Sequence, residues 1–196
     1  GSVVCVSTIG LSPDACPFDN PQLIYQSVAR ELSWPPADPE SPPGRGIDTA
    51  LRVALDELRE TMTDEALIEW LDTCFRRTPV DSLSFRRAVA LFAKAYIAGD
   101  IDAEEHAAAW LRGEECAGSV RTAMGLSETI RKDNGMRMIR SLCQVLRALG
   151  SPGLLLCFDE MDRNLSLPPK RRRAVADNLR ELIDMCGLES LPGLMC

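Results

Sequence analysis

The sequence has 196 residues, of which 45% are hydrophobic, 26% charged and 5% aromatic, and its formal net charge is −7 at pH 7. This composition is ordinary for a globular domain, and the scarcity of aromatic residues favours helices over a β-sandwich. The negative charge argues against nucleic-acid binding through the overall field, and no stretch approaches the roughly 20 apolar residues that a membrane span needs.

The chain opens with a predicted buried strand and an amphipathic helix. Residues 3–8 (VVCVST) are apolar or β-branched on both faces, which is typical of a parallel strand inside a sheet. A helix is predicted for residues 21–32, with proline in its first position and Asp19 or Asn20 as its N-cap. Residues 34–46 contain many prolines and glycines and are predicted to form a loop.

Helical patterns dominate the middle of the chain. We predict helices at 47–61, 63–76, 82–98, 102–112 and 134–148. Thr63, Ser82 and Asp102 are the expected N-caps of three of them, because their side-chain oxygens can accept backbone N–H bonds. Six aromatic residues have helical spacing and are expected to form a small core of this segment: Trp70, Phe75, Phe85, Phe92, Tyr96 and Trp110.

The last part of the chain returns to an α/β pattern. A second buried strand is predicted at 154–158, a basic helix at 170–186, and a third strand opening in the final LPGLMC. We therefore predict an α/β fold, predominantly helical overall, in which a partial parallel sheet carries a large helical insert. The expected division is a core strand and helix in 1–45, the insert in 46–150 and the continued core in 151–196.

Eight cysteines are spread along the chain without a C-x-x-C pair, and several lie among aliphatic residues. They are interpreted as small buried hydrophobic residues of a protein in the reducing cytoplasm. A zinc site is disfavoured, because the clustered Cys or His spacing is missing and His106 is the only histidine.

The sharpest chemical pattern is LLLCFDEMD, residues 154–162, in which an apolar strand leads directly into two carboxylates. A parallel strand delivers such residues to its carboxyl end, where α/β sheets bind ligands. In P-loop ATPases the first acid helps to hold Mg²⁺ and the second activates the attacking water. This reading assigns the metal to Asp159 and the water to Glu160. The competing interpretation is a strand that simply ends in a solvated acidic turn.

A phosphate-binding loop of the form G-x-x-x-x-G-K-[ST] does not occur in the sequence. If the acidic strand belongs to a P-loop ATPase, we expect this loop upstream of Gly1. A basic run, Lys170 followed by Arg171, Arg172 and Arg173, opens the last helix. These arginines are candidates for contact with phosphates or a neighbouring subunit, but charge runs of this kind more often form a solvated helix face with partners such as Asp177.

Residues 83–193 resemble the P-loop ATPase domains of BREX-type phage-resistance proteins. The resemblance is carried by FRRAVALFAKAYIAGD, AAAWLRGE, MGLS, VLRALGSPGLLLCFDEMD and RRRAVADNLRELIDMCGLESLPGL, and the earlier VVCVSTIGLSP and LIYQSVARELSWP also fit. It implies an AAA-like or STAND-like nucleotide-binding fold, ATP and Mg²⁺ as ligands, and a role in phage defence with self-association or other defence subunits as partners. The matched motif carries over only to Asp159 and Glu160.

This sequence departs from that family by lacking the phosphate loop, and we therefore expect the chain alone to be inactive. Two functions remain open at this stage. The first is a piece of an ATP-hydrolysing core. The second is a non-catalytic interaction or scaffold module of the same assembly, which docks a partner through the helical insert.

Overall fold

The computed structural model describes residues 5–10, 17–34, 44–159, 166–187 and 193–195, and for residues 7–10 it describes the backbone alone. Within these ranges the strands form one mixed sheet in the order β2-β1-β3-β4. The strands are β1 (Cys5–Gly10), β2 (Leu32–Ser33), β3 (Leu154–Asp159) and β4 (Leu194–Met195).

The centre of the sheet is parallel. β1 and β3 pair over six residues, from Cys5 opposite Leu154 to Gly10 opposite Asp159. β4 also runs parallel to β3, whereas β2 is antiparallel to β1. The predicted third strand is thus confirmed, although only its first residue is buried: Leu194 is 3% exposed and Met195 is 46% exposed.

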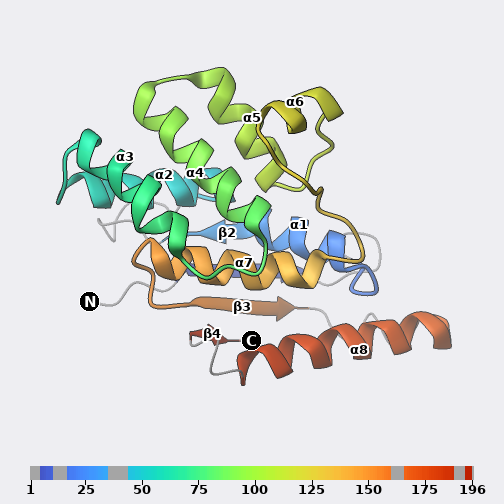
Figure 1. Ribbon diagram of the computed structural model, residues 1–196. Coiled ribbons are helices and arrows are strands. Elements are labelled where there is room, and N and C mark those ends of the chain that lie inside the picture. The colour runs from blue at the N-terminus through green and yellow to red at the C-terminus, as the bar shows by residue number, and fades with distance from the viewer. Residues whose placement is uncertain (1–4, 11–16, 35–43, 160–165, 188–192, 196) are drawn as a thin grey trace.

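Helices make up most of the described chain, as predicted (Figure 1). In chain order they are α1 (Pro21–Glu31), α2 (Ile47–Arg59), α3 (Asp64–Thr73), the 3₁₀ turn η1 (Phe75–Arg77), α4 (Leu83–Ala98), α5 (Ile101–Leu111), α6 (Gly118–Ala123), α7 (Gly135–Ala148) and α8 (Pro169–Cys186).

Three predicted helix starts are confirmed by their capping bonds. The side chains of Asn20, Thr63 and Ser82 accept backbone N–H groups of Gln22, Ala66 and Phe85. Each bond satisfies a donor that the first helical turn leaves without a partner.

Two local predictions are wrong, and one helix was missed. Leu32 leaves the helix with a ψ of 128° and pairs with β1, and the structure assigns a short strand there that the sequence did not reveal. Asp102 is not an N-cap. Gly99 ends α4 in the left-handed conformation (φ 71°), so Asp100 becomes the cap and accepts the N–H of Ala103 at 3.1 Å. The short helix α6 was also missed.

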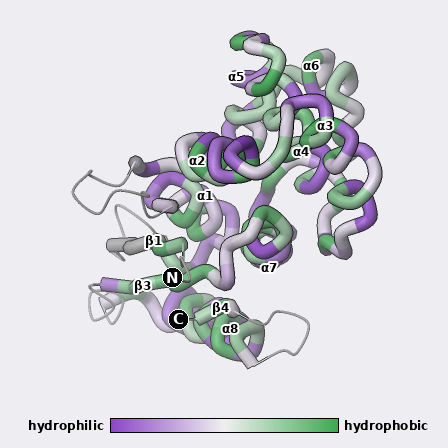
Figure 2. Tube along the Cα trace, turned by 90° about the vertical axis from the view of Figure 1, so that its left-hand side faces the viewer, coloured by the Kyte–Doolittle hydropathy of each residue, from purple (hydrophilic) through white to green (hydrophobic). Residues whose placement is uncertain are grey.

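α1 and α7 lie side by side against one side of β1 and β3, and α8 lies next to β4 (Figure 2). The three parallel strands follow one another across the sheet in the order β1, β3, β4. Parallel crossovers are almost always right-handed, so two crossovers in one direction place their helices on the same face. This geometry explains why α7 and α8 are neighbours.

The hydrophobic core is continuous, and the expectation of a separate aromatic core within 46–150 is wrong. Phe85 of α4 lies edge-to-face with Trp110 and with Tyr25 of α1, at 6.2 Å between ring centroids in both pairs. The buried hydroxyl of Tyr25 donates a hydrogen bond to the carbonyl of Leu111 at the end of α5. The helices of the central segment therefore pack directly on α1, while the division into 1–45, 46–150 and 151–196 stays a prediction.

The cysteines follow the prediction in part. Cys5 and Cys143 are fully buried, and burial raises the pKa of each thiol to about 11. Cys74, in contrast, is exposed at the end of α3. In the part of the chain that the structure describes, no helix is long and apolar enough to cross a membrane.

Candidate functional site

The acidic strand end lies at the carboxyl edge of the sheet. Asp159 is the last residue of β3, is exposed, and pairs in register with Gly10 at the end of β1. Because β1 and β3 are parallel, their carboxyl ends meet at one edge, which is where open α/β sheets bind ligands. Glu160 falls outside the described residues.

The same edge holds the N-terminal ends of α1 and α8 (Figure 1). Phe18, just before α1, lies edge-to-face with Phe158 of β3 at 5.2 Å between centroids. The side-chain amide of Asn178 on α8 donates to the carbonyl of Phe18 at 2.8 Å. These contacts fix α8 and the entry to α1 next to the end of β3.

Arg171 makes the principal electrostatic contact at this edge. Its Nε lies 2.8 Å from Asp19 Oδ2 and its second guanidinium nitrogen lies 3.0 Å from Oδ1, which is a bidentate pair across 152 residues of sequence. The hydrogen bond from Arg171 lowers the pKa of Asp19 below its ordinary value. Sequence reasoning offered Asp177 as a partner for the basic run and missed Asp19.

The remaining arginines of the basic run differ from Arg171. Arg172 and Arg173 are exposed on the first turns of α8 and make no ion pair with any residue that the structure describes. Of the three arginines, Arg171 alone is paired with a carboxylate of the described residues.

The Arg171–Asp19 pair predicts a pH-dependent contribution to stability. Because the pKa of Asp19 is lower in the folded than in the unfolded chain, the pair stabilises the fold above the unfolded value, about 3.9 for aspartate, and this contribution is lost as the pH falls through the folded pKa. We expect Arg171→Ala to lower the thermal midpoint slightly at pH 7. At pH 3 the difference from the wild type should shrink. Thermal unfolding followed by circular dichroism at both values measures it.

Arg172→Ala is the matched control for this prediction, since it removes the same charge one residue further along α8 without breaking the pair. It should leave the midpoint nearly unchanged at both pH values. An Arg171 variant whose deficit is equal at pH 7 and pH 3 would contradict the role given to Asp19.

The donor set at the strand end fits Mg²⁺ bound together with phosphates. Mg²⁺ is usually held by one or two carboxylates, with waters and substrate phosphates completing its shell. Asp159 provides one exposed carboxylate at the carboxyl edge. Among the described residues, no group of three or more His, Cys, Asp or Glu side chains could hold a metal by itself.

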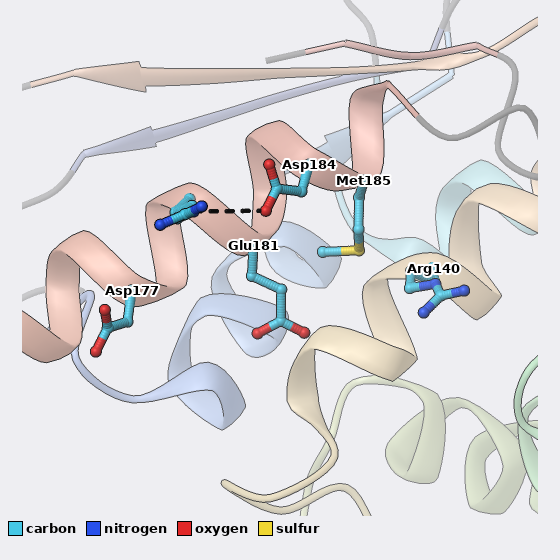
Figure 3. Close-up of a pocket in the computed structure, with 6 residues that line it drawn as sticks. Arg140, Asp177, Glu181, Asp184 and Met185 are labelled. Carbon is cyan, nitrogen blue, oxygen red and sulfur yellow. Dashed lines mark ion pairs between the residues drawn. The ribbon is translucent and has the colours of Figure 1, made fainter.

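A shallow hollow of about 280 Å³ lies elsewhere, between α7 and α8 (Figure 3). Glu181 and Met185 extend from α8 toward α7, and Arg180 pairs with Asp184 along α8 at 3.8 Å. The charged residues that line the hollow are two arginines and three carboxylates, so its net charge is small. It offers no cradle for a triphosphate, and we place the candidate site at the sheet edge instead.

Comparison with known proteins gives one finding. A family model described as BREX system ATP-binding protein BrxC/D matches residues 47–196, a range that includes the central helices, β3 with the acidic pair, α8 and β4. No match is found among the curated proteins or the solved structures.

Proposed function

The chain belongs to the family of BREX system ATP-binding proteins BrxC/D, and we propose that it is part of an ATP-hydrolysing P-loop ATPase that acts in bacterial defence against phage. The observation that carries the proposal is Asp159, an exposed carboxylate at the end of a central parallel strand inside the matched range. This placement agrees with the expected position of a nucleotide site in an open α/β sheet.

In this proposal the two acids have different roles. Asp159 would hold Mg²⁺, which supplies charge neutralisation at the β- and γ-phosphates when it is bound. Glu160 would accept a hydrogen bond from the attacking water and orient it toward the γ-phosphate.

Arg172 and Arg173 are proposed as contacts for phosphate or for a neighbouring subunit. Their support is their exposure at the carboxyl edge and their lack of ion pairs within the described chain. Arg171 shares this assignment only if its bond to Asp19 opens. The basic start of α8 also supports an anionic ligand, because cations at a helix N-terminus are unfavourable without a counter-charge.

We further propose that the phosphate-binding loop lies upstream of Gly1 and that the 196 residues alone do not hydrolyse ATP. The protein would act in the cytoplasm, together with other subunits of the defence system. The alternative is a non-catalytic interaction module, which is favoured by the extent of the helical segment, 46–150.

Calorimetric titration with MgATP separates these two functions. We expect no binding by the 196-residue chain and binding by a longer form that begins upstream of Gly1 and includes a phosphate loop. In the longer form, Asp159→Ala should remove the Mg²⁺ dependence of binding, while Asp177→Ala, an exposed carboxylate on α8, should not. If the longer form does not bind either, the interaction module becomes the better description.

A further inference from the structure

A groove on the helical segment combines an apolar floor with a basic rim. It lies between α3, η1 and α4 and has a volume of about 470 Å³. Its apolar side chains are Leu71, Phe75, Leu83, Ala90 and Leu91, and its cations are Arg76, Arg86, Arg87 and Lys94. Leu71 and Phe75 are buried, whereas Leu83 is 66% exposed, so the apolar surface that the groove presents to solvent comes mainly from Leu83.

The charge of this groove is opposite to that of the chain. Four cations face one carboxylate, Asp72, in a protein whose net charge is −7. Asp72 is bonded to Lys94 at 2.6 Å, and Arg86 donates to the carbonyl of Thr78 at 2.7 Å. Arg76 and Arg87 make no ion pair with any described residue. The groove therefore favours an occupant that carries both negative charge and an apolar side chain.

The chain itself carries a projection of this kind, which we term the knob: residues 99–102, which are the turn after α4 and the first two residues of α5. Ile101 is 78% exposed, and it stands between Asp100 and Asp102. Asp102 is exposed and makes no ion pair within the described residues. The knob lies at the outer end of the α4–α5 hairpin, away from the sheet (Figure 1).

The knob lies far from the part of its own groove that carries Leu83 and Arg87. The groove runs along α4 from Leu83 to Lys94, and the knob follows the last residue of the same helix. With a rise of about 1.5 Å per residue, α4 places Gly99 about 24 Å from Leu83 and about 18 Å from Arg87. The knob of a second molecule is not held away from this part of the groove.

We infer that the groove binds the knob of a second copy of this chain, with Ile101 on the apolar floor and Asp102 facing Arg87 and Arg76. The contact is heterologous, because the knob and the groove are different surfaces of the chain. A pair of molecules joined by one such contact keeps a free knob and a free groove, to which further copies can add as rings or chains. It does not depend on nucleotide and stands apart from the proposed ATPase function.

Sedimentation velocity of the 196-residue chain tests this inference. We expect self-association that grows with protein concentration and weakens when the salt concentration rises from about 0.05 M to about 0.5 M, since the rim charges are exposed and screened. Arg87→Glu and Asp102→Arg should each raise the apparent dissociation constant about tenfold by replacing an attraction with a repulsion. Arg180→Glu makes the same charge change on α8 and should leave the association unchanged.

A mixture of the two variants gives the sharper result. Arg87→Glu keeps an intact knob and Asp102→Arg keeps an intact groove, and the altered knob and the altered groove also carry opposite charges. An equimolar mixture should therefore recover the association that each variant alone has lost. Ile101→Ser provides a third variant on the knob, far from the core, and should weaken association without affecting folding. A chain that stays monomeric at low salt and high concentration would overturn the inference. So would association that neither charge variant changes, or a mixture that remains monomeric.

Discussion

Replacing Glu160 with glutamine in the longer, loop-containing form is expected to reduce ATP turnover by about 100-fold or more, while ATP binding is retained. Glutamine keeps the size of the side chain but removes the negative charge that orients and activates the attacking water. General-base contributions of this kind are about 100- to 10,000-fold in rate. A coupled phosphate-release assay measures turnover, and calorimetry on the same sample measures binding.

Glu181→Gln is the matched control, because Glu181 is an exposed carboxylate on α8, away from the sheet edge. It should preserve turnover within about twofold. Hydrolysis that continues at the wild-type rate in Glu160→Gln would refute the assignment of Glu160 as general base. This outcome would not bear on the role of Asp159, because Mg²⁺ binding is tested by calorimetry and not by the rate of turnover.

The elements that sequence reasoning located correctly are those whose signals are local. A serine, threonine or asparagine before an apolar periodic stretch marks a helix start, and Asn20, Thr63 and Ser82 all cap helices in the structure. The error at α5 is instructive. Both Asp100 and Asp102 can cap a helix. Asp100 is the cap because Gly99, in the left-handed conformation, ends α4 one residue before it.

The features that were missed depend on contacts between distant residues. Leu32 reads as the end of a helix, but pairing with β1 draws it into the sheet. Arg171 and Asp19 are 152 residues apart, and only the parallel arrangement of β1 and β3 brings the segments that follow them together. No local pattern contains this information, because strand order is set by the packing of the whole chain.

A repeated tripeptide in the sequence could have predicted the groove between α3, η1 and α4. The tripeptide Phe-Arg-Arg occurs twice, at Phe75–Arg77 and again ten residues later from Phe85. In both copies the phenylalanine is fully buried. A buried phenylalanine followed by two arginines places cations at the surface beside the hydrophobic core. Two copies in neighbouring elements therefore predict a basic surface above buried aromatic side chains.

Replacing Gly135 with alanine is expected to destabilise the fold by about 2–3 kcal/mol. Gly135 begins α7 and is buried against the start of α1. A Cβ at this position would lie 2.3 Å from both the carbonyl carbon and the carbonyl oxygen of Pro21. These are backbone atoms, so relief requires α1 and α7 to separate. The higher helix propensity of alanine offsets at most about 1 kcal/mol, and the steric effect therefore decides the sign.

Gly118→Ala is the control, because Gly118 also begins a helix, α6, but is exposed and has no atom within 4 Å of an added Cβ. It should be neutral or stabilising by up to about 1 kcal/mol. In a protein of this length, the Gly135 substitution corresponds to a thermal midpoint lower by about 5–10 °C. Equilibrium unfolding in urea gives the free energies directly. Equal stability of the two variants would show that α1 and α7 do not approach as closely as the structure indicates, and the position of α1 at the candidate site would then have to be revised.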